Sequence, residues 1–316
     1  MRLRHKKNAE ELILNEKYCI NNFFDVNINN INSDKINENK YFDINKKIFN
    51  NNNELYLELG VGKGQFIIEN AIKNPNINFI GIEKSATILL KTIDNLKNKI
   101  NELMNISNKL NLNVNHSVLP TQYGDNRFIN KEEITNQEKT FTNNFYDKNK
   151  DISNNSDFAM QSRKNQGRYH TGNLYNRLIS GSNNNKGTDI KNLRFLCTDI
   201  IYLDKYFNNN YISKIYLNFS DPWPKDRHYK RRLTYREFLN KYYNLLKDNG
   251  IIEFKTDQKD LFDFTLEEIK ETKFKLIAHT YDLHNDNNLN KNNIMTEYEQ
   301  KFSKLGNKIC KLILRK

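Results

Sequence analysis

The chain has 316 residues, and 50 lysines and arginines against 38 aspartates and glutamates give it a formal net charge of +12. Its apolar runs fall far short of the ~20 residues that a membrane-spanning helix needs, and residues 1–20 carry no secretory signal. Three widely spaced cysteines exclude a disulfide scaffold and show no zinc-ligand spacing, so no metal site is predicted. The length allows one large or two ordinary domains, and the positive surplus suggests a polyanionic partner.

Residues 1–53 form the first predicted region. They begin with the basic run MRLRHKK, continue into a short helix-like stretch and end in an asparagine-rich segment without hydrophobic periodicity. Asparagine supplies 56 residues of the whole chain, which we interpret as compositional drift rather than as a sign of function. We therefore predict a basic N-terminal arm followed by a linker.

Residues 54–104 alternate strand and helix signals. Apolar runs over 55–59 and 77–83 predict two buried strands, and an amphipathic pattern after each of them predicts a helix. Pro75 ends the first of these helices, which is expected over 65–74. This order is typical of a parallel sheet with helices on its faces, so the region is predicted to be the first part of an α/β domain.

Residues 105–188 break the alternation. Nineteen of these residues are asparagine, and apolar residues are sparse. Such a composition buries too little apolar surface to offset the entropy lost on ordering. We predict a low-complexity, disordered insertion, and a contact with RNA or with another protein is the alternative interpretation.

The alternation resumes over residues 189–316, which we predict to be the second part of the same domain. The predicted strands cover 193–199, 215–221, 251–257, 274–283 and 308–316, and the predicted helices cover 235–247 and 260–272. The first three of these strand runs each end in an aspartate.

A glycine-rich loop, Glu58-Leu-Gly60-Val-Gly62-Lys-Gly64, follows the first predicted strand. Glycines at this point let the backbone pass close to a ligand and turn sharply into the next helix. Glu83 ends the second predicted strand, where a carboxylate can accept hydrogen bonds from both ribose hydroxyls of an adenosyl group. The pattern indicates a nucleotide-type cofactor.

Two cofactors fit such a loop. A dinucleotide places its pyrophosphate on the helix N-terminus, usually through GxGxxG, whereas S-adenosylmethionine presents a sulfonium and an amino acid. Because Glu58 adds a carboxylate beside the loop, the cationic methyl donor is favoured. Asp199, Asp221 and Asp257 are expected at the carboxyl edge of the sheet, where open α/β folds bind ligands, although any one of them could be a helix cap.

The densest local signal is the run NFSDPWPKDRHYKRR, which holds the only tryptophan, Trp223, and two of the four prolines. Pro222 disfavours helix at Asp221, so this acid is predicted on a rigid turn. Residues 225–236 then carry six lysines and arginines and one acid. We expect these cations to contact phosphates, and Trp223 or Tyr229 to stack on a base.

Six motifs resemble the bacterial-type tRNA (guanine-N7)-methyltransferase family: MRLRHK, LELGVGKGQFI, NFSDPWPKxRHxKRRLTYxxFL, FKTDxxxLF, DLH and MTEYExKFxxxGxxI. The resemblance covers about residues 1–20, 54–100 and 190–316. It implies a Rossmann-like class I methyltransferase fold, with a mostly parallel seven-stranded sheet flanked by helices. It also implies methylation of N7 of the guanine at position 46 in the tRNA variable loop.

The resemblance further implies roles for single residues. It assigns the S-adenosylmethionine site to Glu58, Gly60, Gly62, Gly64, Glu83, Asp199 and Asp221, and makes Asp221 the candidate catalytic residue. It assigns the guanine or the tRNA to Lys225, Arg227, His228, Lys230, Arg231, Arg232, Asp257, Thr296, Glu297, Tyr298 and Glu299. The chain departs from the family at Asn8, where an aromatic is frequent, and in the long segment 105–188.

Guanine N7 has an in-plane lone pair, so the predicted mechanism needs no general base and consists mainly of in-line placement. A carboxylate near the ring would stabilise the developing positive charge, and we predict this role for Asp221. Asp257 is expected to accept hydrogen bonds from guanine N1–H and N2–H₂, with Glu299 as the alternative. Lys225 is expected at guanine O6 or at the adjacent phosphate.

Two other functions compete with this prediction. An amino-methyltransferase of another nucleic-acid base usually carries Asp or Asn, two prolines and an aromatic, from which Asp221-Pro222-Trp223-Pro224 departs. A non-catalytic RNA-binding subunit would be expected to lose the acids that this chain keeps. The predicted partner is tRNA, without a membrane or an obligate protein partner, in a monomer or homodimer. Because the basic arm begins at Met1 without a leader, a cytoplasmic location is expected.

Overall fold

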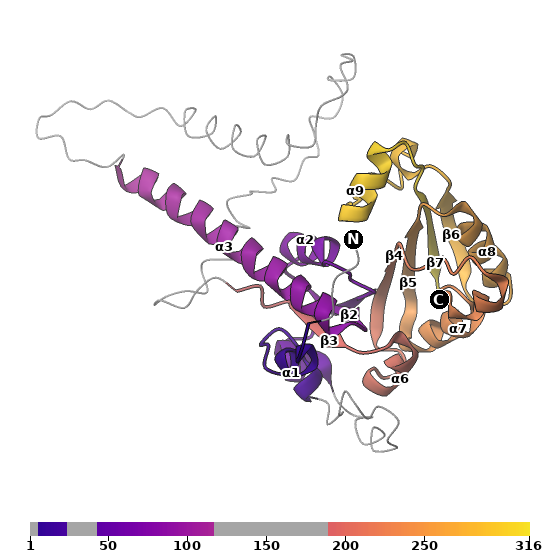
Figure 1. Cartoon of the computed structure of the whole chain (residues 1–316), viewed down its shortest axis with the longest axis horizontal. Helices are drawn as coiled ribbons and strands as arrows, with labels where there is room; N and C mark the ends of the chain where they lie inside the picture. Colours follow the sequence, from indigo (N-terminus) through magenta and orange to yellow (C-terminus); the bar gives the residue numbers. More distant parts are fainter. Residues whose placement is uncertain (1–5, 24–42, 117–188) are drawn as a thin grey trace, which may run out of the picture. The chain divides into compact units, whose positions relative to one another are not determined.

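The computed structural model describes residues 6–23, 43–116 and 189–316 (Figure 1). They form one seven-stranded sheet in the order β3-β2-β1-β4-β5-β7-β6. The strands are β1 (Glu54–Leu59), β2 (Ile77–Glu83), β3 (Leu193–Cys197), β4 (Ile212–Asn218), β5 (Leu246–Thr256), β6 (Lys275–Thr280) and β7 (Cys310–Arg315). Neighbouring strands from β3 to β5 are parallel, and β7 runs antiparallel to both β5 and β6. The predicted mostly parallel sheet of seven strands is confirmed.

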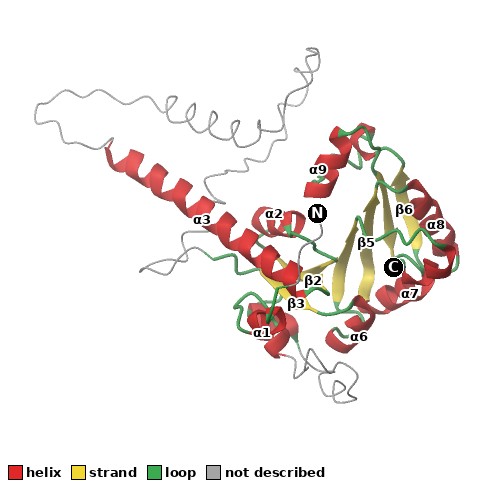
Figure 2. Ribbon diagram, viewed as in Figure 1, coloured by secondary structure: helices red, strands yellow, loops and turns green. Residues whose placement is uncertain are grey.

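Helices cover both faces of this sheet. Helices α2 (Gln65–Lys73) and α3 (Ala86–His116) lie on one side, and α7 (Arg236–Leu245) and α8 (Lys259–Lys270) lie on the other (Figure 2). Shorter elements are α1 (Ala9–Leu14), η1 (Asn21–Phe23), η3 (Asn45–Phe49), η4 (Ile200–Tyr202), α6 (Leu203–Tyr206), η5 (Asp226–Arg231), η6 (Leu283–Asn285) and α9 (Glu297–Lys304). Parallel strands joined through helices require such crossovers, as the alternating pattern predicts.

The core lies on both faces of the central strands. Leu57, Ile215 and Phe254, on β1, β4 and β5, are fully buried. A strand covered on both faces has no solvent side, which is why these strands read as nearly continuous apolar runs. Burying each such side chain stabilises the fold by about 1.5–3 kcal/mol, so the sheet forms a rigid support for the residues at its carboxyl edge.

Part of the predicted N-terminal arm belongs to the sheet domain. The Ile20 amide donates to the Phe195 carbonyl at 2.9 Å, and the Phe195 amide donates to the Tyr18 carbonyl at 2.8 Å. These two bonds add a short parallel bridge outside β3. Residues 18–20 are therefore a fixed extension of the sheet.

The end of the predicted linker also packs into the core. Ile44 is buried, and the Asn78 side chain on β2 donates to the side-chain oxygens of Asn45 at 2.8 Å and Asn51 at 2.7 Å. The predicted boundary at residue 53 therefore differs from the structure, in which residues 43–53 are part of the domain. The sequence pattern missed them because their role depends on buried asparagine pairs rather than on apolar periodicity.

The predicted insertion begins inside helix α3. The chain divides into a sheet domain ending at Leu103 and resuming at Asp189, and a second unit from Met104 to Thr188. This division lies within one residue of the predicted boundaries, but α3 continues through the first of them to His116. The prediction of disorder for the rest of the segment concerns residues 117–188, which lie outside the described residues.

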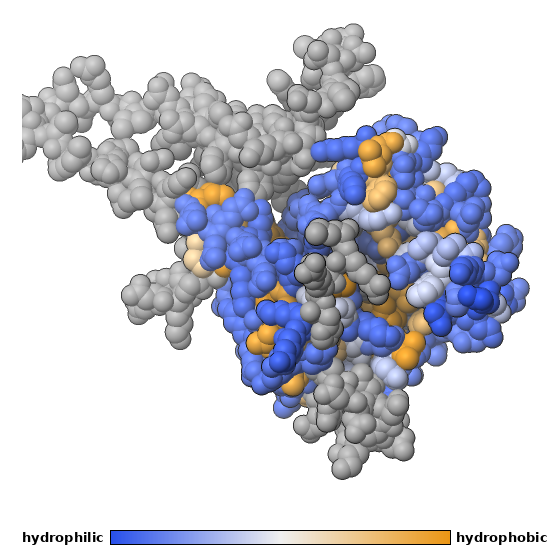
Figure 3. Space-filling model, viewed as in Figure 1, coloured by the Kyte–Doolittle hydropathy of each residue, from blue (hydrophilic) through white to orange (hydrophobic). Residues whose placement is uncertain are grey.

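Within the described ranges, no helix combines the length and the apolar character needed to cross a membrane. The visible surface of the described residues is mostly hydrophilic, with scattered apolar side chains (Figure 3). Cys19, Cys197 and Cys310 are free and buried, in agreement with their expected role as small apolar side chains.

Candidate active site

The glycine loop after β1 takes a conformation that only glycine adopts readily. Gly60, Gly62 and Gly64 have φ angles of 78°, 54° and 81°. No atom lies within 4 Å of a Cβ built on Gly60 or Gly62, whereas one on Gly64 would collide with Thr92 of α3. Gly64 is therefore required for packing, and the other two leave open space in which a ligand can approach the backbone.

Glu58 lies under this loop at 2% exposure. Its Oε1 accepts a hydrogen bond from the Asn218 side chain at 2.9 Å, but its buried Oε2 has no partner among the described residues. Burial raises the pKa of this carboxyl to about 8, and the hydrogen bond from Asn218 and the charge of Lys255 oppose the shift. A buried carboxylate with an unused oxygen is suited to a cationic ligand group.

Glu83, at the end of β2, holds the glycine loop. Its carboxylate accepts hydrogen bonds from the Ser85 amide at 3.0 Å and the Gly62 amide at 3.4 Å. Burial raises its pKa, and the negative charge of Asp221 adds to the shift. The structure therefore brings the predicted acids of β1, β2 and β4 to the same edge.

Asp199 follows β3 and is already engaged. One carboxylate oxygen accepts from the Ile201 amide at 3.1 Å and caps η4, and the other lies 2.6 Å from the Lys84 ammonium. The helix-cap interpretation of this aspartate is correct. Each oxygen retains a free lone pair, so the cap does not preclude a ligand contact.

Asp221 occupies an exposed turn after β4 and has no hydrogen bond or ion pair within the described ranges. Phe219 and Trp223, two residues before and after it, have positive φ angles of 52° and 43°. Such left-handed conformations are uncommon for large side chains and persist only where neighbours enforce them. The predicted rigid turn is present, and it presents the carboxylate outward.

Arg232 is one of the neighbours that enforce this turn. Its guanidinium donates to the Pro222 carbonyl at 2.9 Å and the Trp223 carbonyl at 3.1 Å, and it lies 4.3 Å from the centre of the Phe264 ring. Arg232 was predicted to contact tRNA. In the structure it is an internal brace of the turn that carries Asp221.

The other basic residues of the segment remain at the surface. Lys225, Arg227, Lys230 and Arg231 are exposed around the short 3-10 helix η5, and His228 is half-buried beside the Trp223 ring. The Arg231 guanidinium lies 5.1 Å from the centre of the same ring. We name these five side chains the basic ridge. The two lysines and two arginines among them form an exposed cationic surface next to Asp221.

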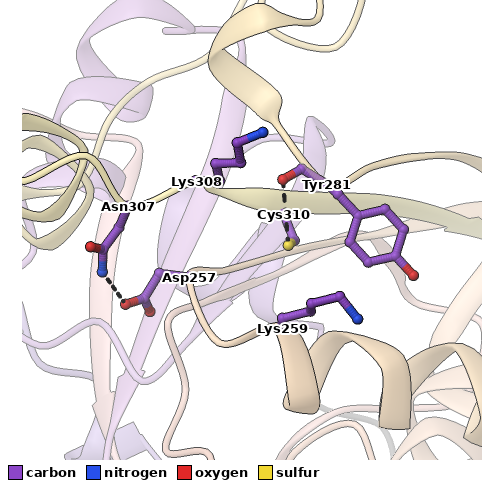
Figure 4. Close-up of a pocket in the computed structure, with 6 residues that line it drawn as sticks. All are labelled: Asp257, Lys259, Tyr281, Asn307, Lys308 and Cys310. Atoms are coloured by element: carbon purple, nitrogen blue, oxygen red, sulfur yellow. Dashed lines mark hydrogen bonds between the residues drawn. The ribbon is translucent and has the colours of Figure 1, made fainter.

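Asp257, at the end of β5, lies at the mouth of a cavity of about 360 Å³ (Figure 4). Its Oδ2 accepts from Gln258 at 3.1 Å, from Asn307 at 3.3 Å and from the Tyr298 hydroxyl at 3.4 Å. The cavity is lined by Asp257, Lys259, Tyr281, Asn307, Lys308 and Cys310. These contacts use one oxygen of Asp257, and within the described ranges its Oδ1 accepts no hydrogen bond.

Helix α9 brings the predicted C-terminal residues to this edge. Thr296 caps the helix by accepting from the Glu299 amide at 2.9 Å, and Glu297 pairs with Lys63 of the glycine loop at 2.7 Å. The Tyr298 ring lies 4.9 Å from the Phe219 ring beside Asp221. This helix was not predicted from the sequence, although Thr296 and Glu299 have the capping-box spacing that indicates a helix start.

Glu299 does not reach the open edge. It is fully buried, and its carboxylate contacts Lys255 at 2.6 Å, Asn293 at 2.6 Å and His284 at 3.0 Å. Burial alone would raise its pKa, but His284 and Lys255 lower it overall, so the group is a buried carboxylate ion. Glu299 is therefore a structural anchor here, and Asp257 is the acid open to a substrate.

Several contributors were not predicted. Lys63, Lys84, Asn218 and Lys255 all hold predicted acids in place, and only Lys255 had a sequence signal, as a charged residue inside an apolar strand run. Among the described residues, no three histidine, cysteine, aspartate or glutamate side chains gather in the manner of metal ligands.

Comparison with known proteins identifies the family. A family model described as Putative methyltransferase matches residues 52–130 and 172–312. The tRNA (guanine-N(7)-)-methyltransferase of Mycoplasma capricolum subsp. capricolum is 36% identical over 270 residues, 85% of each chain. That of Mesoplasma florum is 34% identical over 323 residues, covering 100% of this chain and 99% of its own. A solved antibiotic-related methyltransferase has 14% identity and a TM-score of 0.44, covering 86% of this chain and 91% of its own. The chain therefore belongs to the tRNA (guanine-N(7)-)-methyltransferase family.

Proposed function

We propose that this protein methylates N7 of a guanine in tRNA, at position 46 of the variable loop, with S-adenosylmethionine as the methyl donor. One observation carries the proposal: an exposed carboxylate without a partner among the described residues, Asp221, follows β4 at the same sheet edge as the buried acids Glu58 and Glu83, and the basic ridge follows it directly in the chain. The buried acids suit a small cationic ligand, and the ridge has the charge for a polyanion. A tRNA substrate also fits the cytoplasmic location expected from the sequence.

The residues present fit the methyl donor. The unpartnered Oε2 of Glu58 would accept from the donor's ammonium, and the open space at Gly60 and Gly62 would admit its amino-acid portion against the backbone. Glu83 would hold the ribose hydroxyls, and Asp199 the adenine edge. Gly64 supports the loop through packing.

S-adenosylmethionine supplies a methyl group activated by the sulfonium to which it is attached. The protein's own contribution is placement, because the N7 lone pair needs no deprotonation. Asp221, on its braced turn, would stabilise the positive charge that develops on the imidazole ring of guanine. The strained φ angles on both sides of Asp221 hold the carboxylate in position before the substrate arrives.

Asp257 and the basic ridge would recognise the substrate. The free Oδ1 of Asp257 would accept from N1–H and N2–H₂ of guanine, a pair of donors that no other standard base presents together. Lys225 would contact O6 or the neighbouring phosphate, and the remaining cations of the ridge would bind the tRNA backbone. Residues 1–5 of the basic arm, predicted to assist, lie outside the described residues.

Labelled S-adenosylmethionine and unmodified tRNA transcripts test the proposal. Label should enter tRNA, and borohydride followed by aniline should cleave the chain at the methylated guanine. A transcript with adenine in place of guanine 46 should accept no label. Label on an exocyclic amine would favour the amino-methyltransferase alternative, and tRNA binding without transfer would favour the non-catalytic one. Cleavage at a different guanine would refute the assignment to position 46, but not the methylation of guanine N7 in tRNA.

A further inference from the structure

Lys255 is a buried charge in the middle of the sheet. It lies on β5 at 3% exposure, two residues before Asp257, and its register partners are Asn218 on β4 and Lys311 on β7. A buried lysine is costly unless it is paired and fully hydrogen-bonded. Its contacts therefore indicate what this position is for.

All three hydrogen bonds of the Lys255 ammonium go to one stretch of chain. It donates to Glu299 Oε2 at 2.6 Å, to Asn293 Oδ1 at 3.0 Å and to the Ile294 carbonyl at 3.0 Å. These acceptors all lie in residues 293–299, which lead into α9 and form its first turn. One side chain of the central sheet thus attaches the whole stretch.

Glu299 closes the attachment from the other side. His284 and Asn293 contact its second oxygen at 3.0 Å and 2.6 Å, and its amide is capped by Thr296. The fully buried carboxylate has a partner on each oxygen. Because this network is satisfied, it defines a single position for the start of α9.

The attached stretch carries the contacts that reach the reaction edge. Tyr298 packs against Phe219 at 4.9 Å, next to Asp221, and its hydroxyl lies 3.4 Å from Asp257. Glu297 lies beside it and pairs with Lys63 of the glycine loop. A shift of α9 would therefore displace one wall of the substrate edge.

We propose that Lys255 is a positioning residue, which holds α9 through Glu299 so that Tyr298 orders the edge between Asp221 and Asp257 for the target base. This inference rests on the proposed function for its effect on methylation. The claim that Lys255 fixes the position of α9 is separate from the proposed function and can be tested without any substrate. Lys255 contacts neither the donor nor the base in this role.

The structure offers a matched control. Lys214, on β4, forms an ion pair with Glu253 on β5, and Glu253 also pairs with Lys311 at 3.1 Å. Lys214 lies four residues before Asn218, away from the carboxyl edge, and contacts no part of residues 293–304 among its described interactions. Lys214→Met removes a lysine from the same sheet without touching α9.

The test compares Lys255→Met/Glu299→Gln with Lys214→Met. The double variant avoids leaving Glu299 as an unpaired buried charge, so it should fold even where Lys255→Met alone does not. We expect kcat/KM for tRNA to fall at least ~tenfold in the double variant. The affinity for S-adenosylhomocysteine, measured in parallel, reports separately on the effect of the Lys255 charge on Glu58. Lys214→Met should change both by less than ~threefold.

Amide hydrogen exchange gives the readout that does not depend on activity. Residues 297–304 should exchange faster in the double variant and at the parental rate in Lys214→Met. Unchanged protection of α9 in the double variant would overturn the inference. A loss of tRNA turnover equal to that of Lys214→Met would also overturn it. If the parental chain transferred no methyl group to tRNA, the proposed function would fail, and the exchange result would still decide the role of Lys255.

Discussion

The two sides of the reaction edge differ in their exposure. On the side of β1 and β2, Glu58 and Glu83 are largely enclosed, and burial raises the pKa of both. On the side of β4, Asp221 and the basic ridge face outward without internal partners for most of their charges. A small cation can be enclosed and matched by few groups, whereas a folded RNA is bound through an open surface. The difference indicates that donor affinity depends on a few buried atoms and tRNA affinity on many exposed ones.

Asp221 joins the two sides, and its replacement should produce the largest effect. We expect Asp221→Ala to slow methyl transfer by ~10²–10³-fold, because a preorganised charge opposite the developing cation is lost. Affinity for tRNA should change less than ~threefold, since one exposed carboxylate contributes little to binding a polyanion. Single-turnover transfer and filter binding measure the two quantities. Asp226→Ala, the neighbouring exposed acid, is the control, and an equal loss of tRNA binding would contradict the catalytic role.

Glu58→Gln should separate donor from tRNA binding. With a pKa of about 8, Glu58 can ionise when a cationic ammonium binds beside it, whereas Gln cannot, so we expect S-adenosylhomocysteine to bind the variant ~10–100-fold more weakly by calorimetry. Affinity for tRNA should stay within about threefold, because the site of substitution is fully enclosed. Glu54→Gln, at the exposed start of the same strand, should alter neither. Loss of tRNA affinity in the Glu58 variant would show that the two sides are not independent.

The raised pKa of Glu58 also predicts a pH effect on stability. Its value of about 8 in the folded chain lies above the ordinary 4.5, so the protonated carboxyl favours folding. This stabilisation is complete below about pH 4.5 and is lost as the pH rises through 8. The free energy of unfolding, relative to Glu58→Gln, should therefore fall by at most ~1.4 kcal/mol per pH unit across that range. If the free energy of unfolding, measured by denaturant titration, changed with pH equally in the two proteins, the raised pKa of Glu58 would be contradicted.

Two neighbouring arginines should give opposite results. Arg231→Ala removes a cation of the basic ridge, so we expect ~3–10-fold weaker tRNA binding and a salt slope reduced by about one. Arg232→Ala instead releases two carbonyls of the Asp221 turn, so the transfer step should slow more than tRNA binding weakens. Filter binding over a salt series and single-turnover transfer distinguish them. Identical profiles would show that Arg232 also serves as a phosphate contact.

The smallest effect is expected from shortening the chain. Replacing residues 117–188 by a short linker removes the asparagine-rich segment beyond α3 while keeping every residue of the reaction edge. Methyl transfer should stay within about threefold of the full chain, measured with the same tRNA. A folded but inactive product would show that the segment contributes to the substrate side.

Much of the fold followed from local pattern. The strand run at 77–83 and the helix at 65–74 match β2 and α2 closely, because apolar periodicity reports burial directly. The run at 251–257 covers only the second half of β5, which begins at Leu246, inside the predicted helix 235–247. Residues 43–53 were missed because their position depends on Asn78, which is distant in sequence and leaves no local signal. Helix α9 does have a local signal in its Thr296–Glu299 capping box, but its placement on the sheet depends on Lys255, which is also distant in sequence.

The sequence by itself determined the chemistry at the edge of the sheet. Strand-end acids, a glycine loop and a basic run must meet there once the strands are parallel, since parallel strands end at a common edge. Only the tertiary structure decided which groups are free to react. Arg232 and Glu299 are of the same residue types as exposed charged residues near them in the sequence. Packing nevertheless directs Arg232 toward the carbonyls of the Asp221 turn and buries Glu299 against Lys255. Whether a charged side chain is free to contact a ligand depends on the partners that folding brings to it, and residue type alone cannot specify these partners.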